Sequence, residues 1–156
     1  MVAGMPQGLA VEAIVQITDE VLEAFTRLLP QLSTSATVNR QLLERLVVHD
    51  ATELFVARLD GSVVGALTLV AYPIPTGLRA HIDDVVVDAS ARGRGVGEAL
   101  VAHALVRASA AGAKTVDLTS RPGRDAAIRL YLRLGFVRRD SHLYRFQIPD
   151  AGNSTA

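Results

Sequence analysis

The chain has 156 residues and no cysteine, and its 16 basic residues balance its 16 acidic ones. This length supports one domain with a full core rather than two domains. The lack of cysteine excludes disulfides, zinc–thiolate centres, iron–sulfur clusters and a cysteine nucleophile. A balanced charge gives no field that favours nucleic acid, and no apolar run reaches the roughly 18 residues of a membrane-spanning helix. Without a basic leader and apolar stretch at the start, we expect a cytoplasmic protein.

The two parts of the chain differ in charge. Residues 1–60 hold eight acidic and four basic groups, whereas residues 61–156 hold eight acidic and twelve basic groups. Fifteen of the 16 basic residues are arginine, which binds phosphate oxygens through paired hydrogen bonds. A general preference for arginine would explain the composition, but it leaves the clustering in the second part to be explained.

The first half of the chain predicts an antiparallel meander with two helices. Apolar residues alternate over residues 11–17, as in a strand. Thr18 and the two acids after it are typical of a helix start, and Pro30 is expected to end that helix. A second helix is expected up to residue 49. Three strands are expected next, at residues 52–59, 62–70 and 78–88. An Asp-Gly turn at 60–61 joins the first two of these strands.

The second half alternates strands and helices. In chain order we expect a strand at 81–88, a helix at 96–111, a strand at 115–119, a helix at 124–134 and a strand within 136–148. Two successive strand–helix–strand units imply parallel neighbours. The predicted fold class is therefore α/β, a single domain with a mixed sheet, antiparallel first and parallel later, flanked by helices. We expect the domain at 10–148, with flexible ends at 1–9 and 149–156.

A glycine-rich turn joins the strand at 81–88 to the following helix. We call its residues the glycine loop: Arg92, Gly93, Arg94, Gly95, Val96 and Gly97. Glycines at such a junction let a phosphate approach consecutive backbone N–H groups, and the helix dipole and two arginines add positive potential. The P-loop and dinucleotide patterns do not fit, because Lys114 is the only lysine and the glycine spacing differs. The loop predicts a pyrophosphate site; the alternative is a sharp turn without a ligand.

The glycine loop resembles the Arg/Gln-x-x-Gly-x-Gly/Ala signature of the GCN5-related N-acetyltransferase (GNAT) family. The preceding Val85-Val86-Val87-Asp88 resembles the family's bulged strand. Further on, the stretch from Ala127 through Tyr131 to Gly135-Phe136 matches a second family motif, Ala-x-x-x-Tyr-x-x-x-Gly-Phe. The resemblance covers about residues 10–148, and two motifs in the expected order make it specific.

The resemblance implies a binding site for acetyl-coenzyme A (acetyl-CoA) in a sheet splayed between its parallel strands. By this similarity the glycine loop binds the pyrophosphate. The stretch Val85-Val86-Val87 meets the pantetheine arm, with the backbones of Val85 and Val87 pairing as an added strand would. Arg124 stands where many members carry Asn, and we expect it to reach a CoA phosphate. The alternative for Arg124 is a surface ion pair with Asp125 or Asp88.

Three residues are candidates for proton transfer. The resemblance makes Tyr131 the donor to the departing thiolate, and a neutral phenol with a pKa of about 10 suits this role; the alternative is a core tyrosine. His81 and Asp83 share one face of a strand, with Asp84 on the other. His81 is a candidate base, and Asp83 a candidate for acting through water or binding the ammonium. In the alternative both are solvated and water carries the proton. We expect no metal, because the histidines lack ligand spacing.

The expected function is transfer of an acetyl group from acetyl-CoA to a primary amine by direct attack, with the Val85 N–H polarising the thioester carbonyl. The acidic residues of 1–60 mildly favour a cationic amine, such as a polyamine, an aminoglycoside or a lysine side chain. One alternative is a non-catalytic acyl-CoA-binding sensor or regulatory module on the same fold, and another is transfer of a longer acyl chain. The expected partners are acetyl-CoA and the amine, without nucleic acid or membrane; pairing of late strands, common in the family, leaves a homodimer open.

Overall fold

The computed structural model describes residue 4 and residues 6–149. The predicted flexible ends fall mostly on residues 1–3, 5 and 150–156, which lie outside the described residues. The chain forms these elements: β1 (Leu9–Ile14), α1 (Asp19–Leu32), α2 (Arg40–Val48), β2 (Thr52–Leu59), β3 (Ser62–Ile74), β4 (Gly77–Val87), a 3-10 turn (Ala89–Ala91), α3 (Val96–Ala110), β5 (Val116–Asp117) and α4 (Asp125–Arg133). Over the described part of the chain, no helix has the length and apolar character needed to cross a membrane.

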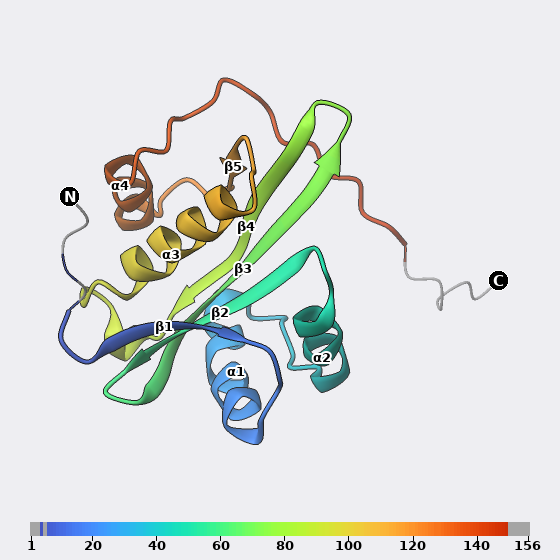
Figure 1. Ribbon diagram of the computed structural model, residues 1–156. Coiled ribbons are helices and arrows are strands. Elements are labelled where there is room, and N and C mark those ends of the chain that lie inside the picture. The colour runs from blue at the N-terminus through green and yellow to red at the C-terminus, as the bar shows by residue number, and fades with distance from the viewer. Residues whose placement is uncertain (1–3, 5, 150–156) are drawn as a thin grey trace.

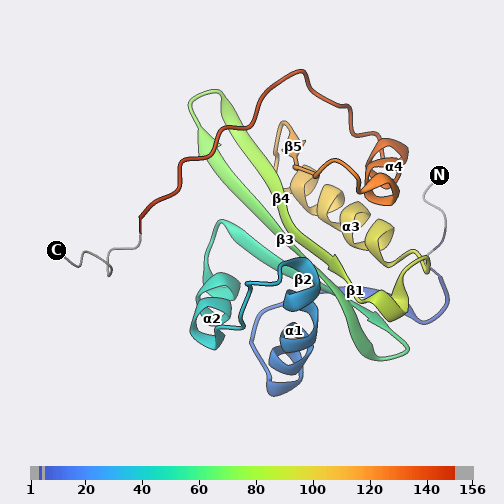
Figure 2. The same ribbon diagram turned by 180° about the vertical axis from the view of Figure 1, so that it is seen from behind.

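The five strands form one mixed sheet in the order β1-β2-β3-β4-β5. The first three junctions are antiparallel, and β4 and β5 run parallel. Helices α3 and α4 lie on one side of the sheet, and α1 and α2 lie on the other (Figure 1 and, from behind, Figure 2). The predicted α/β class with a single mixed sheet is confirmed.

A separate apolar core fills the space on each face of the sheet. On the α3 side, Phe55 and Leu67 pack with Leu100 of α3. On the α1 side, Val56 packs with Phe25 of α1. Because β2 contributes to both cores, its middle is buried on both faces and reads as a continuous apolar run. The sheet is thus fixed from both sides, which gives the loops at its ends a rigid base.

The predicted local signals at several element ends are confirmed. The Thr18 hydroxyl accepts a hydrogen bond from Val21 N at 3.3 Å and begins α1. The turn between β2 and β3 has positive φ at both Asp60 (50°) and Gly61 (87°), as a type I′ hairpin turn requires. The helix expected at 96–111 is followed by Gly112, whose φ of 83° is typical of the glycine that ends a helix.

The ends of β1, α1 and β3 differ from the expectation. β1 ends at Ile14, and Val15 is 79% exposed, so the alternation does not continue to residue 17. Helix α1 runs past Pro30 to Leu32, because a proline two residues before the end removes only one late hydrogen bond. β3 runs to Ile74 rather than to residue 70 and includes Pro73; this proline lies beyond the part of β3 that pairs with β2, so no N–H donor is needed on that edge.

The end of the chain departs most from the expectation. β5 has two residues rather than five, and 136–148 contains no strand. This segment extends from α4 without joining the sheet (Figure 1). Five of its large apolar side chains are exposed: Val137, Leu143, Tyr144, Phe146 and Ile148. Alternating residues need a neighbouring edge to form a ladder, and a two-residue β5 offers almost none. The second parallel crossover predicted from the sequence is therefore absent from the described residues.

Candidate cofactor and catalytic site

The edge of β4 that faces β5 is bare over its second half. β5 pairs with β4 only at Ala80 and His81, so along the described chain no strand covers the edge from there to Val87. Asp88 N donates to Val64 O of the β3 side at 2.8 Å. Since successive residues of a strand direct their N–H groups to opposite sides, the N–H groups of Val85 and Val87 point to the bare edge. An extended chain could pair there.

A β-bulge in β4 lies beside this bare edge. The register changes from Ala66 opposite Val86 to Thr68 opposite Asp83, so Asp84 and Val85 together face Leu67. Asp84 has φ of +50°, a conformation that non-glycine residues seldom adopt. Simple alternation therefore does not set the direction of Asp84. Burial raises the pKa of its carboxyl, and the adjacent Asp83 carboxylate raises that pKa further.

The bulge changes which residues of β4 face each side of the sheet. Ile82 belongs to the core under α3, whereas Val86 belongs to the core under α1. A regular strand would place both on one face. After the bulge, Val85 and Val87 pack against the core under α3. The strand thus presents Val85 and Val87 to the α3 side at the bare edge.

The glycine loop ends in an uncapped helix start. Gly93 and Gly95 have φ of +74° and +77°, which glycine adopts without strain. Gly95 is the N-cap of α3, and no side chain caps that helix start. The first helical hydrogen bond runs from Ala99 N to Gly95 O at 3.0 Å, so the preceding N–H groups lack intrahelical acceptors. By contrast, side chains cap both α1 and α2. The start of α3 is suited to binding an anion.

Two exposed arginines, Arg92 and Arg94, lie in the loop before this helix start, and an exposed Arg124 precedes α4. Arg94 lies 3.8 Å from Asp60 of the β2–β3 turn. For the residues with assigned positions, no carboxylate comes within 4.0 Å of Arg92 or Arg124. The alternative of an Arg124–Asp88 ion pair is wrong, because Asp88 pairs with Arg27. Arg124 also precedes α4 without capping it.

The side chain of Asp88 fixes the chain as it leaves β4. Asp88 is 8% exposed, and its Oδ1 accepts hydrogen bonds from the N–H and hydroxyl of Ser90 at 3.0 and 2.8 Å. Its Oδ2 accepts one from Arg27 Nε at 2.9 Å. The Ser90 and Arg27 hydrogen bonds lower the pKa of Asp88 to about 2. No local sequence pattern indicates Arg27 as a site residue, because 61 positions separate it from Asp88.

Tyr131 lies half-buried on α4, against the same core as Val85 and Val87. Its ring meets Phe136 edge to face, with the centroids 5.8 Å apart. Burial raises the pKa of its hydroxyl, and the nearby Arg124 partly opposes that rise. The phenol is thus protonated at neutral pH and can donate a proton. Tyr131 thus lies on the same side of the sheet as the side chains of Val85 and Val87, and its role is taken up below.

His81 and Asp83 come together as the alternation predicted, with His81 Nε2 3.7 Å from Asp83 Oδ1. Because Ile82 between them faces α3, both side chains lie on the α1 face of the sheet. Tyr131 lies on the other face. The three candidate proton-transfer residues therefore flank the bare edge from two sides rather than forming one cluster.

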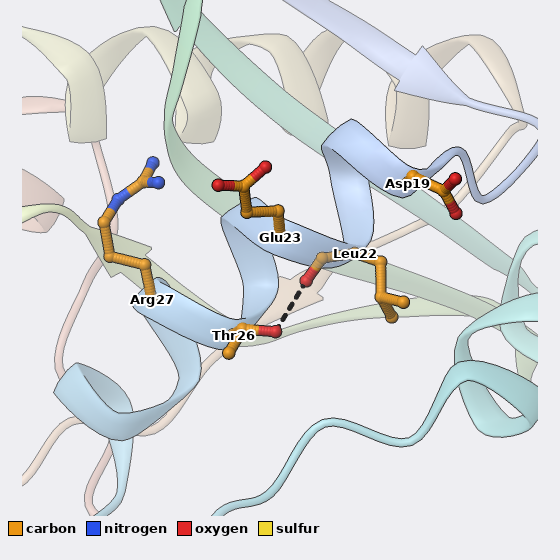
Figure 3. Close-up of a pocket in the computed structure, with 5 residues that line it drawn as sticks. All are labelled: Asp19, Leu22, Glu23, Thr26 and Arg27. Carbon is orange, nitrogen blue, oxygen red and sulfur yellow. Dashed lines mark hydrogen bonds between the residues drawn. The ribbon is translucent and has the colours of Figure 1, made fainter.

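A separate concavity runs along the outer face of α1. It has a volume of about 590 Å³ and is lined by Asp19, Leu22, Glu23, Thr26 and Arg27 (Figure 3). One of these residues, Arg27, also donates a hydrogen bond to Asp88, in the segment before the glycine loop. Throughout the described ranges, 4 and 6–149, no three histidine or acidic side chains gather as a metal site would require.

Comparison with known proteins assigns the family. Residues 14–136 match the model of the Acetyltransferase (GNAT) family, and the chain belongs to this family. No curated protein matches the chain. Among solved structures, "Putative acetyltransferase from Agrobacterium tumefaciens str. C58" has 25% identity and a TM-score of 0.78, covering 88% of this chain and 99% of that one. An acetyltransferase from Trypanosoma brucei has 25% identity and a TM-score of 0.73, covering 90% and 99%. An aminoglycoside acetyltransferase from an uncultured soil metagenomic sample, at 18% identity with a TM-score of 0.74 and coverage of 90% and 96%, shares the fold.

Proposed function

We propose that this protein is an N-acetyltransferase that moves an acetyl group from acetyl-CoA to a primary amine by direct attack. The observation that carries the proposal is the bare edge of β4, which runs from His81 to Val87 and leads into the uncapped start of α3. This arrangement suits a ligand with an extended amide-containing arm and a diphosphate. Membership of the acetyltransferase family supports acyl transfer as the chemistry.

Separate groups of this chain would hold the two parts of acetyl-CoA. The N–H groups of residues 92–97 would bind the pyrophosphate, with Arg92 adding charge. The backbones of Val85 and Val87, flanking Val86, would pair with the pantetheine arm as a strand does. Arg124, which is exposed and has no carboxylate partner among the residues placed by the structure, is available for a further phosphate. The donor supplies a thioester whose acyl carbon is open to attack by an amine.

Three positions on this chain would promote the transfer. The Val85 N–H, which points to the bare edge, would donate to the carbonyl oxygen of the thioester. On the α1 face, His81 or Asp83 would accept, directly or through water, the proton that the ammonium loses before the neutral amine attacks the acyl carbon. On the α3 face, Tyr131 would donate a proton to the sulfur as the carbon–sulfur bond breaks. Proton removal and proton delivery would thus occur on opposite faces of the sheet.

The acidic excess of residues 1–60 is reduced but not cancelled by ion pairs with arginine. Glu12 and Glu20 share Arg58, Asp19 and Glu44 share Arg40, and Glu53 pairs with Arg107. Two carboxylates that share one arginine keep a net negative charge, but none of these carboxylates belongs to β4 or its bare edge. We therefore propose a primary amine without selecting a cationic class.

A screen of amines with detection of the released thiol tests the proposal. The panel should contain a polyamine, an aminoglycoside, an amino sugar phosphate and peptides with free N-terminal or lysine amines. We expect amine-dependent thiol release with acetyl-CoA for at least one class. Binding of CoA without turnover on any amine would favour the sensor. Faster release from a longer acyl-CoA than from acetyl-CoA would favour a different acyl donor.

A further inference from the structure

Helix α1 is joined by side-chain hydrogen bonds to the segment that leads into the glycine loop. Arg27 Nε donates to Asp88 Oδ2 at 2.9 Å, and its terminal nitrogen donates to Val63 O at 2.6 Å. One turn further along α1, Gln31 Oε1 accepts from Ala89 N at 2.9 Å. The two α1 residues therefore hold the two residues that follow β4, Asp88 and Ala89.

The segment held in this way leads directly into the glycine loop. Ala91, the last residue of the 3-10 turn, is 2% exposed, and its N–H donates to Asp88 O at 2.9 Å. The next residue is Arg92. The Asp88 carboxylate also caps the turn through Ser90. Because Arg92, the first residue of the glycine loop, directly follows Ala91, a tilt of Asp88 or Ala89 would move the N–H groups of the loop.

Arginine at position 27 can hold the segment before the glycine loop in place better than lysine could. Its planar guanidinium reaches a carboxylate and a carbonyl at once, whereas lysine offers a point charge with no fixed fork. The contacts fix the direction of the loop entrance as well as neutralising Asp88. Figure 3 shows Arg27 on α1 one turn after Glu23, without a dashed contact between them.

We propose that Arg27 and Gln31 are positioning residues that hold the glycine loop in the shape that binds the diphosphate of CoA. This inference rests on the proposed function. Because α1 covers the same face of the sheet as His81 and Asp83, the helix on the proposed acceptor side is linked to cofactor affinity. Loss of the α1 contacts should weaken CoA binding even when the fold survives.

A simpler account is that the positive charge of Arg27 attracts the phosphates from a distance. The two accounts predict different CoA affinities for two variants. Arg27→Lys keeps the positive charge but loses the planar guanidinium that reaches Asp88 and Val63 together, and Gln31→Met alters no charge. Arg107→Met is the matched control, because Arg107 makes two hydrogen bonds to Glu53, at 3.0 and 2.9 Å, in the last turn of α3. It lies 11 residues beyond Val96, so about 16 Å along the helix from the loop.

The experiment is calorimetric titration of CoA into the full-length wild type and these variants, with thermal unfolding of each. We expect CoA affinity to fall about tenfold for Arg27→Lys and about threefold for Gln31→Met, and to stay unchanged for Arg107→Met. The loss in Arg27→Lys should persist at high salt, since it arises from geometry and not from screened charge.

Two outcomes would overturn the inference. If Arg27→Lys binds CoA as tightly as the wild type, the guanidinium geometry has no role. If all three variants lose affinity in proportion to their loss of thermal stability, the α1 contacts act only on the fold. Failure of the wild type to bind CoA at all would instead overturn the proposed function and the inference with it, which separates the two failures.

Discussion

Gly65 of β3 lies directly against Val96, the first residue of α3: a Cβ added to Gly65 would stand 2.9 Å from Val96 Cγ1. The same Cβ would lie 3.1 Å from Val86 O and from Leu100 Cδ1. Val96 is almost fully buried, so the neighbour cannot turn away to solvent. The absence of a side chain at Gly65 therefore lets the start of α3, with its free N–H groups, sit on the sheet beside the end of β4.

The first prediction is that Gly65→Ala lowers the free energy of unfolding by about 1–3 kcal/mol through overpacking. Gly97→Ala is the control, because its Cβ would lie 3.4 Å from Leu130 Cδ2, an ordinary contact, and its φ is not positive. We expect the control to change stability by less than about 1 kcal/mol, and in the stabilising direction. Denaturant unfolding of both variants measures this. Equal effects at the two glycines would contradict the packing described for Gly65.

The second prediction concerns the acid stability contributed by Asp88. Its pKa is lowered from an ordinary value of 3.8 to about 2 by the hydrogen bonds from Ser90 and Arg27. A carboxyl group whose pKa is lower in the folded state than in the unfolded state stabilises the fold. This stabilisation is complete at pH values above the unfolded-state pKa and is lost as the pH falls through the folded-state pKa. The difference in unfolding free energy between wild type and Asp88→Asn should be about 2 kcal/mol at pH 6 and should shrink between pH 4 and pH 2. If the difference in unfolding free energy between wild type and Asp88→Asn did not change with pH, the lowered pKa of Asp88 would be contradicted.

Much of the fold follows from short-range sequence signals, and the structure confirms those. The Thr18 cap, the Asp60-Gly61 turn and the glycine that follows α3 each depend on a few neighbouring residues. The prediction of a strand within residues 136–148 was wrong for a different reason. Alternation at Tyr144, Phe146 and Ile148 indicates a strand only when a partner edge exists, and the length of β5 was not readable from its own residues.

The residues of the candidate site also fall into those that a local motif indicates and those that depend on distant parts of the chain. The glycine loop and Tyr131 carry family motifs, so the sequence alone indicates both as candidates. Arg27 and Gly65 act across the fold on residues far away in the chain, and no motif marks them. The resemblance predicted a bulged strand around Val85–Asp88, whereas the register of β3 against β4 places the bulge at Asp84 and Val85. Only that register shows which side chains of β4 face α3.

The third prediction tests whether Arg124 contacts a phosphate. If it does, the affinity of the wild type for CoA should weaken with added salt, because the interaction is solvent-exposed. Arg124→Asn, which introduces the commoner family residue, should bind CoA with a shallower salt dependence and keep activity. Titration at several salt concentrations checks this. An affinity and salt slope equal to those of the wild type would make Arg124 a surface residue without a phosphate role.

The fourth prediction concerns Tyr131→Phe. The variant keeps the ring against Phe136 and removes only the hydroxyl, so the fold and the CoA affinity should be retained. Turnover should fall by about 10²–10⁴, toward the lower end because a thiol is a moderate leaving group. Since burial raises the pKa of Tyr131, wild-type turnover should show no loss near neutral pH from ionisation of this group. Steady-state rates with an identified amine measure both effects; undiminished turnover would remove Tyr131 from the mechanism.

Binding of CoA at the glycine loop is measured most directly by calorimetric titration of wild type, Gly95→Val and Gly112→Val. Both glycines have positive φ, +77° and +83°, and they lie at opposite ends of α3, so the backbone strain is matched. At Gly95 a side chain would also occupy the space before the free N–H groups, where a Cβ already stands 3.1 Å from Pro6 Cγ; at Gly112 nothing lies within 4 Å. We predict CoA binding by the wild type and by folded Gly112→Val, and none by folded Gly95→Val. Unchanged affinity in Gly95→Val would show that the diphosphate binds elsewhere.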